Sequence, residues 1–179
     1  KLRVAVIGAT GYTGLDLILI LSNHPKVLIK NLCATNNLGK KISFFDNRIK
    51  KNLPKISSIN EIDWHCLDLV FLSLPTGEAQ KIIRKNFFKN NKLKFIDLSA
   101  DFRIYNIKKY EKNYKIKHKA KNLIKYSLYS IPEFNKNIIN NYRIISNPGC
   151  YPTSIQMPLI PLIKKNMIKL KDITIDSKS

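Results

Sequence analysis

The sequence predicts an α/β fold in which helices cover both faces of a doubly wound parallel sheet. Short apolar segments alternate along the chain with segments of helical length, and turn-forming residues separate them. The short segments are apolar almost throughout instead of alternating with polar residues, which is typical of strands buried on both faces. A chain of 179 residues with 44% apolar residues can bury one good core.

The strand and helix patterns follow one another in the order that this fold requires. A first strand is expected at residues 2–7, and a helix follows at 15–22 and ends before the stop signal at 23–25, so His24 is expected at the helix end. Residues 40–60 and 105–129 show no pattern that assigns them. The remaining expected elements are strands at 27–34, 67–72, 93–98 and 143–146, and helices at 77–88 and from 151 onward.

A glycine-rich turn, Gly8-Ala9-Thr10-Gly11-Tyr12-Thr13-Gly14, joins the first strand to the first helix. Glycines at such a turn let the chain bend tightly, let a pyrophosphate approach the backbone and let the helix pack close to the sheet. The helix N-terminus adds N–H groups for phosphates. A glycine turn that binds nothing is the alternative. The turn predicts a Rossmann-like dinucleotide site that uses Gly8, Thr10, Gly11, Tyr12, Thr13 and Gly14.

The end of the second expected strand indicates which dinucleotide binds. An NAD-selective site usually has an acidic residue there, which holds the ribose 2′-hydroxyl. Here the strand runs into Thr35, Asn36 and Asn37, with Lys40 and Lys41 after them, and no carboxylate is present. Hydroxyl, amide and ammonium groups suit a 2′-phosphate, so Thr35 and Asn36 are predicted to bind NADP(H).

The loop after the strand at 67–72 is expected to border the same cofactor. Ligands of a doubly wound sheet lie beyond the carboxyl ends of its strands. Ser73, Pro75 and Thr76 stand directly after such an end. These three residues are therefore predicted to contact the dinucleotide.

A cysteine follows a Pro-Gly turn in Asn147-Pro148-Gly149-Cys150-Tyr151-Pro152-Thr153. If a helix starts at Tyr151, Cys150 stands at its N-terminus, where unpaired N–H groups and the helix dipole favour a thiolate. Cys150 is therefore predicted to be a catalytic nucleophile that forms a covalent acyl intermediate. From position alone, a small buried residue at a strand-to-helix corner is the alternative.

The last residues predict a second structural unit. Residues 173–176 have the pattern of a new strand, and the sequence stops three residues later. We expect an NAD(P)-binding domain over residues 1–146, followed over 147–179 by the beginning of a second, α+β catalytic and dimerisation domain that is incomplete.

The net charge of +20 raises the question of nucleic-acid binding. Almost all of the excess is lysine, which occurs with many asparagines and isoleucines, so a drift towards A/T-rich codons explains it equally well. The lysines are scattered and not interleaved with aromatic residues, so we expect no nucleic-acid partner. A basic RNA-binding module is the alternative, and a steep salt dependence of RNA affinity would support it.

Cysteine number and hydropathy exclude several other classes. The three cysteines form no CxxC pair, which argues against a disulfide framework and a metal site, and Cys33 and Cys66 are expected to face the core. No apolar run reaches the roughly 18 residues that a membrane span needs. The chain enters a strand pattern at its first residues, so we expect no signal peptide, no membrane partner and a cytoplasmic location.

Four segments resemble N-acetyl-gamma-glutamyl-phosphate reductase of arginine biosynthesis, in the semialdehyde dehydrogenase superfamily. They are the glycine turn, the Asp-Leu-Ser-Ala-Asp-Phe-Arg segment at 97–103, the cysteine segment at 147–153, and residues 176–179. They stand in the family's order and extend along the whole chain. The glycine turn is shared with aspartate-semialdehyde dehydrogenases, whose cysteine context differs.

The resemblance implies NADPH-dependent reduction of N-acetyl-L-glutamyl 5-phosphate to N-acetyl-L-glutamate 5-semialdehyde and phosphate, with Cys150 as the nucleophile. It also implies a histidine acid/base, which none of His24, His65 and His118 matches, so that residue is expected after Ser179. For the complete protein it implies a homo-oligomer, without giving the number of subunits.

Two further residues are candidates for the substrate side of this reaction. Asn147 and the backbone at Cys150 are candidate donors to the tetrahedral intermediates. Arg103 is the candidate for binding the acyl phosphate, because a guanidinium can bind phosphate through two hydrogen bonds. A structural ion pair between Arg103 and Asp101 is the alternative.

Two other functions share these motifs. A reductase of lysine biosynthesis, which acts on an aminoadipyl phosphate presented on a carrier protein, is the nearest. A non-catalytic dinucleotide-binding protein is the other, and the intact cysteine segment argues against it. The sequence departs from the reductase family at Ser130, where the family carries glycine, which leaves the local backbone open because serine tolerates positive φ poorly.

Overall fold

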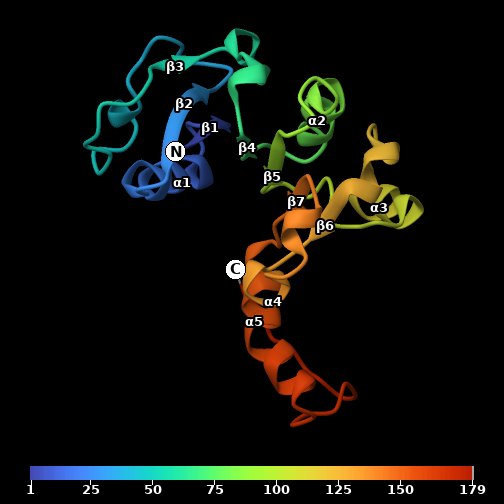
Figure 1. The fold of residues 1–179 in the computed structure, drawn as a ribbon. Helices are drawn as coiled ribbons and strands as arrows, with labels where there is room; N and C mark the ends of the chain where they lie inside the picture. Colours follow the sequence, from blue (N-terminus) through green and yellow to red (C-terminus); the bar gives the residue numbers. More distant parts are fainter. Residues whose placement is uncertain (179) are drawn as a thin grey trace.

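Seven parallel strands form one sheet at the centre of the structure. The computed structural model describes residues 1–178, and their strand order is β3-β2-β1-β4-β5-β7-β6 (Figure 1). Every neighbouring pair is parallel, and the sheet grows outward from β1 in both directions, which confirms the doubly wound arrangement. The strands are β1 Leu2–Ile7, β2 Val27–Cys33, β3 Ile56–Ser57, β4 Leu69–Leu72, β5 Lys94–Asp97, β6 Ser127–Tyr129 and β7 Ile144–Ser146.

Helices and short 3₁₀ segments make the crossovers between these strands. The α-helices are α1 Tyr12–Asn23, α2 Ala79–Asn86, α3 Ile107–Tyr114, α4 Pro132–Asn135 and α5 Cys150–Lys164. The 3₁₀ segments are η1 Ile42–Phe44, η2 Ile59–Glu61, η3 Trp64–Cys66, η4 Lys121–Tyr126 and η5 Ile139–Asn141.

The two faces of β1 belong to two separate cores. Val4 and Val6 pack in one cluster with Ile18 of α1, whereas the alternate residues Ala5 and Ile7 pack in another with helix α2. Because successive side chains of a strand point to opposite faces, α1 and α2 must cover opposite faces of the sheet. This two-sided burial explains why the strands are apolar almost throughout.

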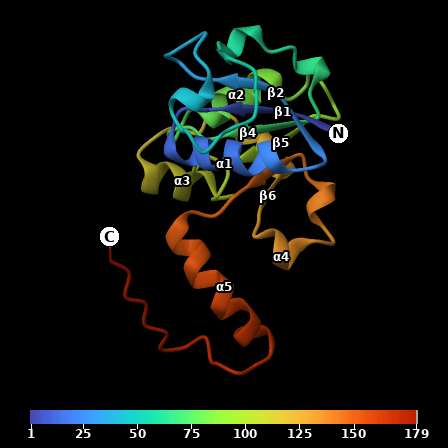
Figure 2. The same cartoon turned by 90° about the vertical axis from the view of Figure 1, so that its left-hand side faces the viewer.

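Helix α5 leaves the layered part of the molecule (Figures 1 and 2). None of its residues is buried, although its sequence is largely apolar. Its start is fixed to the sheet through β7, and farther along Gln156 Nε2 donates to the Tyr129 hydroxyl at 3.1 Å. Pro158 and Pro161 lie inside the helix and remove two backbone donors there.

The structure confirms the expected strands at 2–7, 27–34, 67–72, 93–98 and 143–146, with ends that differ by two residues at most. It also confirms the expected helices. Helix α1 begins at Tyr12, three residues earlier than expected, because the last residues of the glycine-rich segment are already helical. His24 is the C-cap residue of α1, as expected. Cys33 is buried in the core, as expected.

Two strands were not expected from the sequence. Strand β3 has two residues and pairs only with β2, and β6 has three residues and pairs only with β7. Both lie in the segments that showed no pattern. A strand this short holds too few alternations for a period to be read, so its existence depends on the neighbour that it pairs with.

Two other expectations are corrected, and the conformation at Ser130, which the sequence left open, is settled. Residues 173–176 form no strand, because no described strand lies beside them and they are exposed. Cys66 is exposed and not core-facing, since η3 turns its thiol outward to Asp63 Oδ2, at 2.8 Å. Ser130 needs no positive φ: it is buried, extends the β6 pairing through a bond from its N–H to Ser146 O at 3.0 Å, and is absent from the positive-φ residues of the described chain.

Arg143 joins the start of β7 to the neighbouring crossover, which leads to the first prediction. Its guanidinium donates to Leu93 O at 3.1 Å, Phe87 O at 2.6 Å and Asn90 O at 2.8 Å, and lies 3.8 Å from the centre of the Phe87 ring. Lysine cannot reproduce this planar fork, so Arg143→Lys should lower the free energy of unfolding by about 2 kcal/mol. Urea unfolding of the complete protein measures it.

Arg84 supplies the matched control, because it is an arginine exposed on α2. Arg84→Lys should change the free energy of unfolding by no more than about 0.5 kcal/mol. Equal effects of the two substitutions would contradict the role given to Arg143.

Candidate functional site

The last residues of the strands stand in one row across the sheet. The ladders pair Cys33 with Ile7, Ile7 with Leu72, Leu72 with Asp97, and Asp97 with Ser146. The pairing continues one residue further, because Ser73 N donates to Ile7 O and Asn147 N donates to Asp97 O, both at 2.8 Å. All the loops that carry predicted site residues therefore leave the sheet at the same edge.

The glycine turn at this edge requires glycine at two positions. Gly8 has a φ of +88°, and a Cβ there would lie 1.9 Å from Ser73 O. A Cβ at Gly14 would lie 2.2 Å from Gly8 O. Close contact among α1, β1 and the loop after β4 therefore excludes any side chain here.

The amino end of α1 is open for a ligand. Its N-cap is Gly11, which has no side chain to bind the first-turn N–H groups. Tyr12 and Thr13 are exposed and Thr10 is half-buried. A cluster of amide donors at the positive end of a helix is what a phosphate group would need.

The end of β2 presents polar groups without a negative charge. Thr35 and Asn36 are exposed there. Lys40 Nζ donates to Asn37 Oδ1 at 3.0 Å and lies 5.2 Å from the centre of the Phe44 ring. The segment from 34 to 45 contains neither Asp nor Glu, and the next acidic residue, Asp46, is paired with Arg48.

The loop after β4 is held by a carboxylate from another loop. Asp101 Oδ1 accepts from Gly77 N at 2.6 Å, and its Oδ2 accepts from Gln80 N at 2.9 Å. The buried Tyr110 hydroxyl also donates to Asp101, at 2.9 Å. Asp101 thereby satisfies the amino end of α2. This capping fixes the backbone that follows Ser73, Pro75 and Thr76.

Arg103 joins the loop after β5, which also carries Asp101, to the cysteine turn. Its Nε donates to Asn147 O at 2.8 Å, and its Nη2 donates to Leu98 O at 3.0 Å. Its Nη1 lies 3.0 Å from the position that a Cβ of Gly149 would occupy. Within residues 1–178 Arg103 forms no ion pair with Asp101, so that alternative is not realised.

Cys150 is the first residue of α5 and its thiol is exposed. The turn is closed by Thr153, whose N–H and hydroxyl both donate to Gly149 O. Asn147 Nδ2 donates to Pro148 O at 3.0 Å. Strand order places β7 three positions from β1, so the cysteine turn and the glycine turn lie roughly 15 Å apart along the edge.

None of the three histidine side chains is available for acid/base chemistry at this edge. His118 is buried, its Nδ1 accepts from Ala120 N, and its Nε2 lies 2.8 Å from Asp101 O. A carbonyl only accepts, so Nε2 carries the proton and the ring is neutral. Burial lowers the pKa of His118, which agrees with a structural role. His24 caps α1 and His65 lies exposed on η3.

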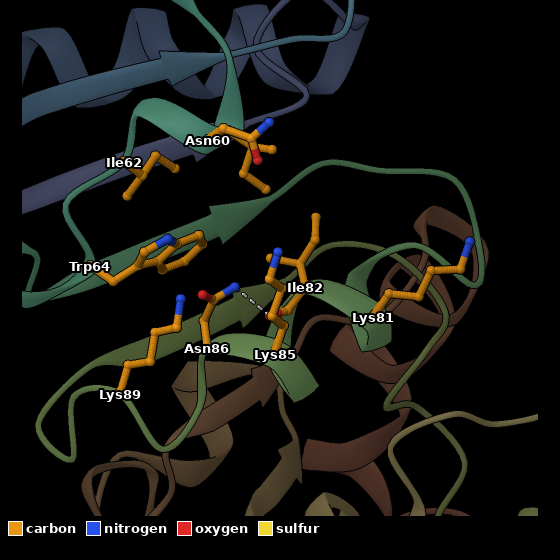
Figure 3. A pocket seen from close by; sticks show the side chains of 9 residues that line it. Asn60, Ile62, Trp64, Lys81, Ile82, Lys85, Asn86 and Lys89 are labelled. Carbon is orange, nitrogen blue, oxygen red and sulfur yellow. Dashed lines mark hydrogen bonds between the residues drawn. The ribbon is translucent and has the colours of Figure 1, made fainter.

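A cleft of about 330 Å³ lies elsewhere, between α2 and the segments η2 and η3 (Figure 3). Trp64 and Ile82 give it apolar walls, and Lys81 and Lys85 of α2 line it together with Lys89, which follows the helix. None of the predicted site residues lines this cleft. The strand-end edge is therefore the candidate site.

Sequence reasoning selected Arg103 from the 97–103 segment and missed the capping carboxylate, Asp101. Asp101 stands in the same segment, but the only partner expected for it was Arg103, two residues later. Only the fold shows that α2 begins beside it.

The described residues offer neither a metal site nor a membrane span. No group of three or more His, Cys, Asp or Glu side chains among residues 1–178 could hold a metal ion. None of the helices in that range is long and apolar enough to cross a membrane.

The chain matches a family described as semialdehyde dehydrogenase, NAD binding domain, over residues 3–142. It is 42% identical over 180 residues to a probable chloroplastic N-acetyl-gamma-glutamyl-phosphate reductase of Oryza sativa subsp. japonica, with 100% of this chain and 43% of that protein covered. It is 44% identical over 185 residues to N-acetyl-gamma-glutamyl-phosphate reductase of Brachyspira hyodysenteriae, with 99% and 52% covered. The chain spans about half the length of these curated relatives.

Solved structures of similar fold are aspartate semialdehyde dehydrogenases. The enzyme II of Vibrio cholerae, complexed with ASA, has a TM-score of 0.65 and 19% identity, with 92% of this chain and 47% of that chain covered. The enzyme of Candida albicans, solved with NADP, has a TM-score of 0.60 and 21% identity, with 92% and 47% covered. At these identities the likeness shows a common fold.

The close contacts of Gly8 lead to the second prediction. Gly8→Ala places a methyl group against Ser73 O and forces an alanine to adopt a positive φ, so it should lower the free energy of unfolding by roughly 2–4 kcal/mol. Dinucleotide affinity should fall at least about tenfold, because the turn must widen. Unfolding and a fluorescence titration with NADPH measure the two effects.

Arg143→Lys is the control for lost stability, since Arg143 binds Leu93 O, Phe87 O and Asn90 O at the amino end of β7, on the opposite edge of the sheet. It should lower the free energy of unfolding by about 2 kcal/mol and leave dinucleotide affinity unchanged. If the two variants bind NADPH equally, the turn at Gly8 is not the phosphate site.

Proposed function

The chain belongs to the semialdehyde dehydrogenase, NAD binding domain family, and we propose that it is part of an NADPH-dependent N-acetyl-L-glutamyl 5-phosphate reductase. The products are N-acetyl-L-glutamate 5-semialdehyde and phosphate, in arginine biosynthesis. One observation carries the proposal: an exposed cysteine at the start of α5 shares a sheet edge with a glycine turn built for close backbone approach. The names of the relatives at 42% and 44% identity favour the glutamyl substrate over the aminoadipyl one.

NADP(H) fits the residues at the edge. A pyrophosphate would lie against the first-turn amides of α1, which Gly11 leaves uncapped, with Gly8, Thr10, Tyr12, Thr13 and Gly14 around it. Thr35 and Asn36 would hold the 2′-phosphate beside Lys40 and Lys41. Ser73, Pro75 and Thr76 would border the nicotinamide half. The related fold from Candida albicans was solved with NADP, which supports the same choice.

Cys150 supplies the nucleophile in this proposal. Its thiolate attacks the acyl carbon, the new S–C bond forms, and the C–O bond to phosphate breaks with its electron pair leaving on phosphate. Bound NADPH supplies the hydride that reduces the acyl group. When the carbon–sulfur bond then breaks, the electron pair returns to Cys150 and the aldehyde is released. An exposed thiol at a helix N-terminus is accessible for both steps.

Arg103 and Asn147 are our candidates for the substrate side. Two donors of Arg103 are occupied by Leu98 O and Asn147 O, which fixes the guanidinium plane. Its Nη1 takes up the space that a side chain at Gly149 would need, one residue before the nucleophile. A phosphate leaving from Cys150 would find this charge beside it. The first-turn N–H groups of α5 and the Asn147 amide would serve the oxyanion.

Other features of the whole enzyme extend the proposal. We infer that the acid/base histidine lies outside residues 1–179, because both ring nitrogens of His118 are bonded to backbone, while His24 caps α1 and His65 lies on η3. Residues 1–146 form the dinucleotide-binding domain and 147–179 begin the catalytic domain. We infer a homo-oligomer in the cytoplasm with small-molecule partners and neither nucleic acid nor membrane; the rice relative is named chloroplastic.

Replacing the nucleophile gives the third prediction. Cys150→Ser in the complete protein should reduce kcat for NADPH oxidation with N-acetyl-L-glutamyl 5-phosphate by at least about 10³-fold, because a serine hydroxyl is a far weaker nucleophile at neutral pH. NADPH affinity should stay unchanged. The assay follows NADPH absorbance with both this substrate and the carrier-linked aminoadipyl phosphate.

Cys66→Ser is the control, since Cys66 is also exposed but lies off the site on η3. This variant should keep full activity. Turnover of the aminoadipyl substrate alone would replace the glutamyl proposal by the lysine-pathway one. Normal turnover by Cys150→Ser would remove the covalent scheme.

The polar end of β2 gives the fourth prediction. Thr35→Asp places a carboxylate where the 2′-phosphate is proposed, so kcat/KM for NADPH should fall at least about tenfold while that for NADH rises. Steady-state kinetics with both cofactors measure the ratio. Asn91→Asp, exposed in the loop before β5 at the opposite edge of the sheet, adds the same charge away from the proposed phosphate and should leave the ratio unchanged. An unchanged ratio in Thr35→Asp would contradict the assigned 2′-phosphate position.

A further inference from the structure

The cleft between α2 and the segments η2 and η3 has no part in the proposed reaction. Its volume of about 330 Å³ is within the range of sites that hold small molecules, roughly 300–1,000 Å³. Its lining residues are Ile59, Asn60, Ile62, Trp64, Lys81, Ile82, Lys85, Asn86 and Lys89 (Figure 3). None of them belongs to the sheet edge that carries the glycine turn and the cysteine turn. A ligand of this cleft would therefore be distinct from the proposed cofactor and substrate.

The apolar wall of the cleft is part of a packed core. Trp64 is 8% exposed and belongs, with Ile62, to the core cluster that α2 covers. Ile59 of η2 and Ile82 of α2 are partly buried and pack against the same cluster. A wall built from core side chains is in place before a ligand arrives, so the cleft can accept an apolar body without ordering new residues.

The helix side of the cleft carries positive charge. Lys85 and Lys89 are exposed, and neither forms an ion pair within residues 1–178. Lys81, the third lysine of the lining, is paired with Glu78 at 2.5 Å. None of the lining residues is acidic. The two ammonium groups without a carboxylate partner would attract an anion.

The carboxylates on the facing segments do not neutralise these lysines. Glu61 accepts from the Ser58 N–H at 2.8 Å, and Asp63 accepts from the His65 N–H at 3.0 Å. Both carboxylates are therefore engaged within their own short segments, and neither residue lines the cleft. The side chains that do line it carry a net positive charge.

A buried amide adds a directional feature to the cleft. Asn86 is 3% exposed, and its Nδ2 donates to Ile82 O at 2.8 Å. Its Oδ1 accepts no hydrogen bond from the part of the chain that the structure describes. In Figure 3 the amide projects from α2 into the cleft, towards Trp64. An unpaired buried acceptor costs on the order of 1–3 kcal/mol, and a ligand with an N–H or O–H donor would remove this cost.

We propose that this cleft binds a small organic anion that has a flat apolar body and an N–H or O–H donor. The acid group lies between Lys85 and Lys89, the apolar body lies against Trp64, and the donor binds Asn86 Oδ1. Lysine ammonium groups act as point charges without a fixed fork, so a carboxylate, a sulfonate or a phosphate suits them equally. The proposal does not depend on the proposed function, because the cleft shares no residue with the candidate site.

The test uses 8-anilinonaphthalene-1-sulfonate, an aromatic anion with one N–H donor whose fluorescence rises in apolar surroundings. Titrated into the complete protein, the probe should saturate a site that receives excitation energy from Trp64. Trp64 is the one tryptophan in this 179-residue sequence. The transfer that is present in the wild type and lost in Trp64→Phe therefore reports occupancy of the cleft. N-phenyl-1-naphthylamine, which lacks the sulfonate, should bind there at least about tenfold more weakly.

Two variants test the polar contacts. The double variant Lys85→Gln, Lys89→Gln should weaken binding of the sulfonate probe at least about tenfold, because both ammonium groups are lost. Asn86→Leu, which removes the acceptor and nearly keeps the shape, should weaken it about fivefold. The lysine variant decides alone if Asn86→Leu does not fold, since both lysines are exposed.

The double variant Lys108→Gln, Lys112→Gln is the matched control. It removes the same charge at the same spacing from exposed positions of α3, outside the cleft, and should leave the affinity unchanged. Equal effects of the two double variants, equally tight binding of the neutral amine, or no transfer from Trp64 would each overturn the proposal. It is also overturned if the complete protein binds no probe, as when another part of the chain or a second copy covers the cleft.

Discussion

The register of the parallel ladder is the constraint on which the site depends. Ile7, Leu72, Asp97 and Ser146 end their strands in one row, so the loops after them emerge together. A slip of one residue in any pair would reverse which side chains face α1 and α2, exposing one core and burying polar groups in the other. The cost of losing both cores therefore fixes the register, and the register fixes where the glycine turn and Cys150 stand.

One short segment, residues 101–103, connects the two halves of this sheet edge. Asp101 caps α2 and so holds the loop after β4, while Arg103, two residues later, binds the carbonyl of Asn147. Their two charges act separately, each neutralising backbone dipoles of a different loop. The proposed cofactor side and the proposed nucleophile side are thus held by one stretch of backbone, which suits a reaction that needs a hydride donor and a thiol at fixed separation.

Much of the fold and part of the candidate site could be predicted from the sequence, for reasons that differ between elements. The buried strands and the glycine turn carry local signals, namely apolar runs and glycines that no other residue can replace. Strands β3 and β6 are too short for a period, and Cys66 faces solvent only because η3 turns it outward. Partners far apart in the sequence, such as Asp101 with Gly77 or Asp97 with Ser146, follow from strand order, which no local pattern contains.

The central claim is that Cys150 forms a covalent bond to an acyl group. It is tested most directly by mixing the complete protein with N-acetyl-L-glutamyl 5-phosphate in the absence of NADPH, quenching in acid and mapping the peptides by mass spectrometry. The account predicts an N-acetylglutamyl adduct on Cys150, released phosphate in equal amount, and loss of the adduct when NADPH is added before the quench. Phosphate release without an adduct on Cys150, or an adduct on Cys66 instead, would contradict it.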